Sequence, residues 1–591
     1  MSESLWPRLE RVLPKVQSPS AYLGNEFNAI RKEWTPDRFK VGLGFPDAYT
    51  IAMSHLGLQI FYGMLNARED VLAERIFAPW PDLERILRER GIPLFSLENH
   101  RPARDFDLIG FSLQTELEYT NILNLLDLAG IPLRAKDRTT DDPFIIGGGP
   151  IAHYPEPIAE YFDAFILGDG EDALMQVVDF LKAIPRRERG GREGILRELA
   201  GRVPGFYAPS LYDVEYHDDG RIAAVVPRDG APSRVAKAIV PSLEDAYYPL
   251  RPIVPNTEVV HERINLEIMR GCPHKCRFCQ AVNLKNKLRL RPVEQLLRFA
   301  EETYKATGWD EISLTSLSSG DYPHIQELMT RLNARFKDRR VGVALPSLRI
   351  DAKLKELPRL MKTVRKAGFT MAPEAGTFRL RQIIRKPIKD EDLLETAKAA
   401  FSEGWRHVKL YFMCGLPGET DDDLRGILQL ARQVSNVRRE VSNRPGQVNM
   451  TISPFIPKPH TAFQFNGMKT DEEIRRRQEL LRREARNPNL RLKCHDPRRS
   501  FVEAVFARGD RRLAPVVERA WRNGCRFDAW DEWYRHDHWL KTFGESGIDA
   551  GFYAHRDIPA DEVLSWSHLG SHMPDDFFVR EQDEAMAAAA T

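Results

Sequence analysis

The chain has 591 residues, of which 42% are hydrophobic and 29% are charged, an ordinary globular composition that excludes wholesale disorder. Lys plus Arg (86) almost balance Asp plus Glu (85), so a nucleic acid or an acidic membrane would have to be held by a local patch. The N-terminus has no signal-peptide core, and no window approaches the run of about 20 apolar residues that crosses a bilayer. These features predict a soluble cytoplasmic protein of several domains with no membrane contact.

Residues 1–200 alternate between strand-like and helix-like segments, which predicts a doubly wound parallel sheet. The expected strands are 39–45, 76–80, 106–113, 143–149 and 162–170. A ligand crevice is expected at the carboxyl edge of such a sheet. The candidate residues at this edge are Asp47, His55, Gly148, Gly149, Gly168 and Gly170. The glycines either let a ligand approach the backbone or only make tight turns.

Residues 201–258 are expected to form a β-hairpin over 210–227, which turns at 218–220, and then a proline-spaced linker. From 259 to 465 strands and helices alternate again, as in a partial six-unit TIM-type barrel. The expected strands are 264–269, 311–317, 341–346, 369–374, 408–414 and 448–455, with helices between them, one of which covers 358–368.

Three of the six cysteines, Cys272, Cys276 and Cys279, lie within IMRGCPHKCRFCQA, directly after the first of these strands. A zinc site needs a fourth ligand, for which His274 is the only nearby candidate, and such a small site would be crowded. An iron-sulfur cubane with three thiolates instead leaves one iron open for another ligand. A zinc or structural-thiol role is the alternative. The loop at the carboxyl end of a barrel strand is where barrel enzymes build active sites.

The spacing C-x-x-x-C-x-x-C after this strand resembles the radical S-adenosylmethionine (SAM) superfamily, and Phe278 supplies the aromatic residue usual before the third cysteine. The resemblance covers residues 260–465. It implies that the three thiolates hold a [4Fe-4S] cluster whose open iron binds the amine and carboxylate of SAM. Reductive cleavage would then release a 5'-deoxyadenosyl radical, with the electron supplied by a donor such as flavodoxin or ferredoxin.

The same resemblance implies further cofactor contacts at other strand ends. These are Ser319, Gly320 and Asp321 for the methionyl amine, Glu374 for the ribose, Arg379 or Arg381 for the carboxylate, and Gly415 and Gly418 near the adenine. The alternatives are ordinary loop charge for the acids and arginines and turn formation for the glycines. The sequence identifies no residue that carries out the reaction on the substrate. Cys414 fits a radical relay or methyl acceptor, or simply a small buried hydrophobe.

The N-terminal region resembles the cobalamin-binding type of domain that precedes some radical SAM cores. The cobalt-ligand motif D-x-H-x-x-G is absent, because Asp47 and His55 are eight positions apart in FPDAYTIAMSHLG. Cobalamin is therefore either bound without a histidine ligand or has been lost. Together with the cysteine motif, this stretch resembles a bacterial branch of the superfamily without an assigned reaction.

Residues 466–591 are expected to form a small α/β module that ends in a frayed tail, EAMAAAAT. From Arg475 to Arg512 there are thirteen Lys or Arg against five Asp or Glu, a net charge of +8. Such a basic stretch either holds RNA phosphates or is a solvated helix face.

Three functions fit these features. The first is a radical SAM enzyme that modifies a macromolecule such as RNA or a ribosomal component, by methylation rather than sulfur insertion, because the other cysteines lack the spacing of a second cluster. The second is a radical SAM enzyme that acts on a small metabolite. The third is a non-enzymatic iron-sulfur or cobalamin sensor. The macromolecular enzyme, a transferase, is favoured by the extra N-terminal domain and the basic stretch.

Overall fold

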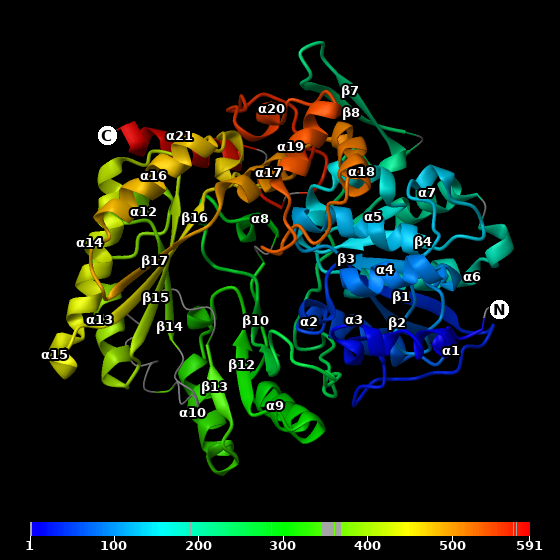
Figure 1. The fold of residues 1–591 in the computed structure, drawn as a ribbon, viewed down its shortest axis with the longest axis horizontal. Helices are drawn as coiled ribbons and strands as arrows, with labels where there is room; N and C mark the ends of the chain where they lie inside the picture. The colour runs from blue at the N-terminus through cyan, green and yellow to red at the C-terminus, as the bar shows by residue number, and fades with distance from the viewer. Residues whose placement is uncertain are drawn as a thin grey trace.

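The computed structural model describes residues 3–189, 191–228, 230–284, 287–345, 360, 368–570, 572–574 and 576–590. Two α/β regions lie side by side, and most of the C-terminal helices lie above and between them in the view of Figure 1. No helix in the described part of the chain is both long and apolar enough to cross a membrane.

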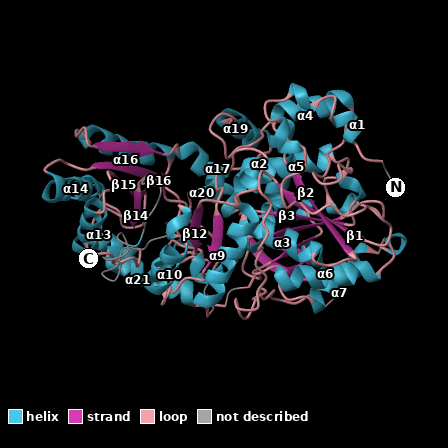
Figure 2. Ribbon diagram, turned by 90° about the horizontal axis from the view of Figure 1, so that it is seen from below, coloured by secondary structure: helices cyan, strands magenta, loops and turns pink. Residues whose placement is uncertain are grey.

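The N-terminal region is built on a six-stranded sheet of order β2-β1-β3-β4-β5-β6, in which only the β5–β6 pair is antiparallel. Its strands are β1 (Phe39–Phe45), β2 (Val71–Phe77), β3 (Leu108–Ser112), β4 (Phe144–Gly148), β5 (Ala164–Ile166) and β6 (Phe206–Tyr207). Figure 2 shows helices on both faces of this sheet. They include α3 (Leu56–Asn66), α4 (Pro81–Arg90), α5 (Tyr119–Leu128) and α6 (Glu171–Ala183). The predicted doubly wound sheet is confirmed.

The second strand is the one that the sequence misplaced. It was expected at 76–80, but β2 begins at Val71 and is buried throughout, including Glu74 and Arg75. Arg75 is fully buried and pairs with Glu26 at 2.7 Å and with Glu98 at 2.6 Å. Charged residues interrupt the apolar pattern that marks a buried strand, so only tertiary pairing explains why this segment enters the sheet.

The predicted hairpin is present as β7 (Tyr212–Tyr216) and β8 (Ile222–Pro227). The six predicted barrel strands are also present, in two parallel sheets of order β13-β12-β9 and β14-β15-β16-β17. They are β9 (Ile264–Glu267), β12 (Glu311–Thr315), β13 (Gly342–Ala344), β14 (Phe369–Glu374), β15 (His407–Cys414) and β16 (Gln447–Pro454). The helix expected over 358–368 falls almost entirely outside the described residues.

A seventh parallel strand, β17 (Leu490–Cys494), pairs with β16, so this sheet continues past residue 465. Its sequence, LRLKC, alternates apolar residues with Arg491 and Lys493 and was read as part of the basic stretch. Helices cover the outer face of the four-stranded sheet in Figure 1. They include α13 (Asp390–Ser402), α14 (Asp421–Val437) and α16 (Asp471–Glu484).

The C-terminal helices pack on both regions. Helices α17 (Pro497–Ala507), α18 (Ala514–Arg522) and α19 (His536–Glu545) place Val502, Val517 and Trp539 in the same hydrophobic core as the N-terminal sheet. The last helix, α21 (Phe577–Ala590), buries Phe577, Phe578 and Ala585. The expectation of a frayed tail was therefore wrong, because this helix has an apolar side that packs on the barrel.

Candidate functional site

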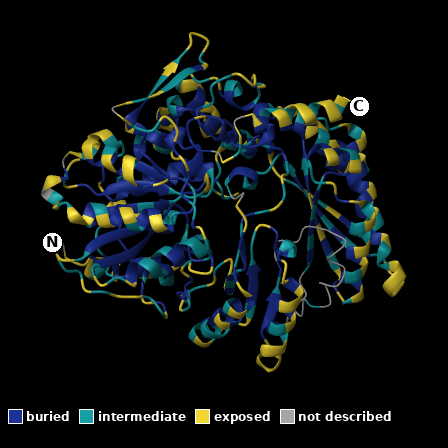
Figure 3. Ribbon diagram, turned by 180° about the vertical axis from the view of Figure 1, so that it is seen from behind, coloured by how far each residue is buried: buried dark blue, intermediate teal, exposed yellow. Residues whose placement is uncertain are grey.

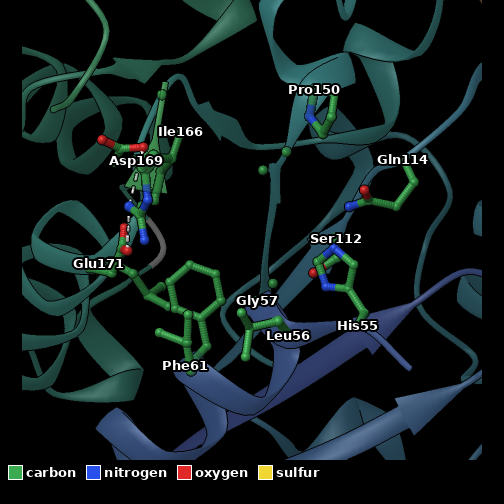
Figure 4. Close-up of a pocket in the computed structure, with 18 of the residues that line it drawn as sticks. His55, Leu56, Gly57, Phe61, Ser112, Gln114, Pro150, Ile166, Asp169 and Glu171 are labelled. Carbon is green, nitrogen blue, oxygen red and sulfur yellow. Dashed lines mark ion pairs between the residues drawn. The ribbon is translucent and has the colours of Figure 1, made fainter. Parts of the chain in front are cut away.

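A cavity of about 450 Å³ lies between the carboxyl edge of the N-terminal sheet and the first strands of the barrel. One wall comes from α3, the ends of β3 and β4, and the turn over 168–171, and the other comes from 267–271 and 315–317. Of the residues predicted at this edge, the cavity is lined by His55, Gly148, Gly149, Gly168 and Gly170. Figure 4 shows His55 near Ser112 and Gln114, on the side of the cavity away from Asp169 and Glu171.

Two glycines leave part of the cavity wall without side chains. A Cβ added at Gly148 would meet only the Ile166 carbonyl oxygen, at 4.0 Å, and one at Gly110 would meet only Ile146, at 3.7 Å. Both residues line the cavity, so a ligand can approach the sheet backbone closely there. The geometry is suited to a flat group laid against the sheet edge.

His55 caps α3, since its Nδ1 accepts the backbone N–H of Leu58 at 3.3 Å. Burial lowers the pKa of His55 to about 4, so the ring is neutral at pH 7. An accepting Nδ1 leaves the proton of the neutral ring on Nε2. In this tautomer Nε2 offers no lone pair to a metal, which agrees with the absence of the cobalt-ligand motif.

Asp47 does not line the cavity, which corrects its place among the predicted crevice residues. Its carboxylate is buried and accepts hydrogen bonds from Trp530 Nε1 at 2.8 Å and from the Ala48 backbone at 2.6 Å. Burial raises the pKa of Asp47. Asp47 therefore ties the end of β1 to the C-terminal segment.

An ion-pair network that no sequence pattern predicted joins the two walls of the cavity. Arg270, just before the cysteine loop, pairs with Glu171 at 2.7 Å, with Glu267 at 2.8 Å and with Asp169 at 3.3 Å. Arg289 pairs with Asp169 as well. The acids of the 168–171 turn belong to the N-terminal region and the arginines to the barrel, so this network fixes one wall of the cavity against the other. This network could not be predicted from the sequence, because its residues come together only in the folded chain.

The three clustered cysteines lie on the loop that follows β10 (Met269–Arg270), and all are of intermediate exposure. Burial raises the pKa of Cys279 to about 11, and the neighbouring Cys276 and Cys272 add to this rise, so the thiols lie within electrostatic reach of one another. Among the described residues, no three His, Cys, Asp or Glu side chains already surround a single point. The fit to a cubane cluster rests on the donor set, because three thiolates on one loop are what such a cluster uses.

The cysteine loop is held by two side chains within the motif. Phe278 packs against a small hydrophobic core that includes Ile384 and Phe463. Arg277 donates to the Ile383 carbonyl oxygen at 3.0 Å and, from Nε, to Glu581 of α21 at 3.0 Å. The C-terminal helix thus braces the loop that carries the cysteines, a contact that the sequence did not predict.

Asp321 lies against the cysteine loop, 2.6 Å from Nε2 of His274. Its Oδ2 also accepts the Ser318 hydroxyl at 2.6 Å. Ser319 is buried and donates to the Leu314 carbonyl oxygen at 2.8 Å, while Gly320 lies in the same short turn. The structure thus brings the predicted 319–321 segment next to the cysteines, with Asp321 as the residue that joins them.

Glu374 ends β14 in a left-handed backbone conformation, with φ of 69°. This conformation costs a non-glycine residue about 1–3 kcal/mol and is concentrated at functional sites. Lys386 Nζ lies 2.9 Å from Glu374 Oε1 and also lies within electrostatic reach of Cys279. Glu374 therefore lies on the cysteine side of the barrel, and its contact with the ribose stays a prediction.

The expectation for Arg381 needs correction. Its side chain is fully buried, and its guanidinium donates to the carbonyl oxygens of Thr377 and Ile388 and pairs with Asp390. These contacts engage the Nε, Nη1 and Nη2 atoms of Arg381, which gives this side chain a structural role. Its neighbour Arg379 pairs with Asp423 at 2.6 Å.

Gly415 and Gly418 both have left-handed backbones, with φ of 86° and 74°. A Cβ at Gly418 would lie 2.6 Å from Ala589 of α21, and one at Gly415 would lie 2.7 Å from Ile474 of α16. These glycines make a turn over which two helices pack, which is the alternative given for them above.

Two family models match the chain: one described as radical SAM proteins, N-terminal, over residues 57–209, and one described as the radical SAM superfamily, over 266–431. Together they match more than half of the residues, and the second contains the cysteine motif. The chain belongs to the radical SAM superfamily. It is therefore an enzyme, and a [4Fe-4S] cluster and SAM are its cofactors, as the sequence predicted. The residues that bind them remain predictions.

An uncharacterised protein of Methanocaldococcus jannaschii is 28% identical over 78% of this chain and 91% of its own length. The ribosomal protein uS12 methylthiotransferase RimO of Chromobacterium violaceum is 24% identical over 28% of this chain and 42% of its own. The threonylcarbamoyladenosine tRNA methylthiotransferase of Danio rerio is 24% identical over 33% and 35%. The radical SAM methyltransferase TsrM of Kitasatospora setae, solved with cobalamin and a [4Fe-4S] cluster, aligns with a TM-score of 0.48 and 14% identity over 72% of this chain and 77% of its own.

Proposed function

We propose that the protein is a radical SAM methyltransferase that modifies a macromolecule, either RNA or a ribosomal component, and that holds a corrinoid between its two α/β regions. The observation that carries this proposal is the shared cavity. It reaches from Gly148, at the edge of the N-terminal sheet, to Gly271, the residue before Cys272. A group bound at the sheet edge therefore lies in the same cavity as the start of the cysteine loop.

Several residues have defined roles in this proposal. Gly110 and Gly148 let a flat macrocycle approach the sheet backbone, and the Arg270 network fixes the opposite wall. His55 keeps its proton on Nε2 and supplies no ligand to cobalt. When both groups are bound, the corrinoid would act as a methyl carrier, and the cluster with SAM would provide one-electron cleavage of the sulfonium.

Methylation is favoured over sulfur insertion, because the latter normally requires a second cluster. Beyond the motif, Cys414 is buried in the barrel core and Cys494 lies against that core. Cys525 is buried in the separate N-terminal core. The remaining thiols are thus divided between two cores. A macromolecular substrate is supported by the names of the two methylthiotransferase relatives, which refer to a ribosomal protein and to a tRNA.

The test supplies the anaerobically reconstituted protein with methyl-labelled SAM, hydroxocobalamin, a low-potential reductant, and RNA and ribosomal-protein fractions in separate reactions. The proposal predicts label in one of the two fractions. It also predicts that Gly148→Leu, whose side chain enters the cavity, weakens hydroxocobalamin binding at least tenfold, measured by absorbance, while the iron content is unchanged.

The matched control is Gly194→Leu on α7 (Arg192–Arg202), where an added Cβ would meet no atom within 4 Å outside its own stretch of helix. This variant should bind hydroxocobalamin as the native protein does. Binding that is equally tight in Gly148→Leu would overturn the corrinoid assignment. Label in neither fraction would overturn the macromolecular substrate.

A further inference from the structure

The inner face of the four-stranded barrel sheet is unusually polar. On β15 the residues Val408, Leu410 and Phe412 are buried in the core shared with α13 and α14. The alternate residues Lys409 and Tyr411 point to the other side and are exposed. Since side chains alternate along a strand, the face turned away from the helices carries this second set. In Figure 1 that face is turned toward β9, β12 and β13.

Strand register aligns this second set into two rows. Lys409 pairs with Asn449, which pairs with Arg491, and two residues further along Tyr411 pairs with Thr451, which pairs with Lys493. Neighbouring strands lie about 4.8 Å apart and alternate residues about 6.6 Å apart along a strand. The three cations therefore lie on a patch about 10 Å across, which we call the cationic inner face: Lys409, Tyr411, Asn449, Thr451, Arg491 and Lys493.

Of the four strands of this sheet, β15, β16 and β17 contain neither Asp nor Glu, and β14 ends in Glu374, whose carboxylate pairs with Lys386. Among the described residues, none forms an ion pair with Lys409 or Lys493. Arg491 Nε lies 2.6 Å from the side-chain amide of Gln447, which orients the guanidinium without neutralising it. Within the described part of the chain, the positive charge of the patch is thus not neutralised.

The outward-facing part of the basic stretch differs, because its charges are compensated. On α16, Arg475 pairs with Asp471 at 2.7 Å, Arg476 pairs with Asp421 at 2.9 Å, and Arg477 pairs with Glu419 at 3.1 Å. Surface pairs of this kind reduce the field available to a ligand. Among the residues that the structure describes, positive charge without an ion-pair partner is therefore found on the inner face and not at these three arginines of the outer helix.

We propose that the cationic inner face binds the phosphate groups of a single-stranded RNA segment, with Tyr411 as a stacking surface for a base. Proteins that hold single strands combine a cationic groove with exposed aromatic rings. Tyr411 is 41% exposed and lies one row from Lys409 and directly across β16 from Lys493. This inference rests on the proposed function and names the substrate class and the surface that would hold it.

The test compares Lys409→Gln/Lys493→Gln with the matched pair Arg482→Gln/Arg483→Gln, which removes two exposed charges from α16. A fluorescent 12-nucleotide single-stranded RNA is titrated by anisotropy at several salt concentrations, with no turnover required. Each phosphate contact contributes about 0.7 to the slope of log K against log salt on single strands. The inner-face variant should lower the slope by about 1.4 and weaken binding at least tenfold at low salt. The α16 variant should match the native protein.

Equal binding by the inner-face variant and the native protein would overturn the inference. So would full competition by a nucleoside monophosphate at the same concentration as the RNA, since a small phosphorylated metabolite would then be the ligand. The labelled-methyl assay is scored separately. Label in RNA with no effect of the inner-face variant on binding refutes the surface and keeps the function. Variant-sensitive binding with no label in any macromolecule refutes the function and keeps the surface.

Discussion

The N-terminal sheet and the four-stranded barrel sheet leave different surfaces open to a ligand. In the N-terminal sheet every residue of β1 and β2 is buried, so only the carboxyl edge remains for a ligand. In the barrel, β15 and β16 are buried at every second residue, and the other residues face the interior. Figure 3 shows this difference as uniformly dark strands in the N-terminal sheet. A parallel strand that is buried at every residue therefore points to an edge site, and one that is buried at every second residue points to an open face.

The cavity between the two regions lies where the two arrangements meet. The N-terminal sheet contributes its edge, and the barrel contributes the strand end that leads to Cys272. The predictions that follow separate the contribution of each region, from the largest effect to the smallest.

The largest effect is expected at the cysteines of the barrel. Changing Cys272, Cys276 and Cys279 to Ala removes every thiolate of the proposed cluster, so iron and sulfide in the reconstituted protein should fall to background. Chemical iron analysis and visible absorbance measure this loss. Cys494→Ser should retain the native iron content. Iron that persists at the native level in the triple variant would place the cluster elsewhere.

Arg270 tests the junction between the two regions. Arg270→Ala leaves the carboxylates of Glu171 and Glu267 without their buried partner, which should cost about 3–5 kcal/mol in free energy of unfolding. Urea unfolding followed by fluorescence measures the change, and Arg482→Ala on the surface should cause none. A stability equal to that of the native protein would show that the two regions do not depend on this network.

His460 tests the segment that runs from the end of β16 back to the N-terminal region. Its Nε2 donates to the His153 carbonyl oxygen at 2.9 Å, and burial lowers the pKa of His460 to about 4. As the pH falls, His460 of the unfolded chain takes up a proton near pH 6.5, whereas the buried ring of the folded protein does so only near pH 4. The folded protein therefore loses stability between pH 6.5 and pH 4 and keeps its full stability from this group above pH 6.5.

From pH 7 to pH 5 this one group should cost about 2 kcal/mol of stability. In His460→Gln the loss over the same interval should be smaller by that amount, measured by urea unfolding at both pH values. His217→Gln, at an exposed position, should keep the native dependence. An unchanged pH dependence in His460→Gln would show that this ring is not held neutral by burial.

The smallest effect is expected at α21. Glu581→Gln weakens the charged hydrogen bond with Arg277 and should lower the free energy of local unfolding of α21 by about 1 kcal/mol. The measurement is the rate of proteolysis in the C-terminal helix, which should increase. Asp583→Asn on the exposed side of the same helix is the control. Equal cleavage rates in the two variants would show that this contact does not hold the helix.

The elements that could be predicted from the sequence are those marked by a periodic apolar pattern or by a fixed motif spacing. The barrel strands, the hairpin and the cysteine loop follow from alternating apolar segments and a fixed motif. The sequence misplaced β2 because Glu74 and Arg75 are charged yet buried, and it missed β17 because Arg491 and Lys493 read as a basic stretch. The exclusion of Asp47 and the bracing of Arg277 by α21 depend on contacts between distant segments, which a linear pattern does not contain. The role of Arg381 depends on side-chain contacts within residues 377–390, which no sequence pattern marks.

The most direct test of the account is the anaerobic cleavage of SAM. The reconstituted protein, supplied with a low-potential reductant, SAM and cellular RNA, is assayed for 5'-deoxyadenosine by mass spectrometry, with the Cys272, Cys276 and Cys279 to Ala variant as control. The account predicts 5'-deoxyadenosine from the native protein and none from the variant. A fully loaded native protein that leaves SAM intact under these conditions would contradict the assignment of radical chemistry to this chain.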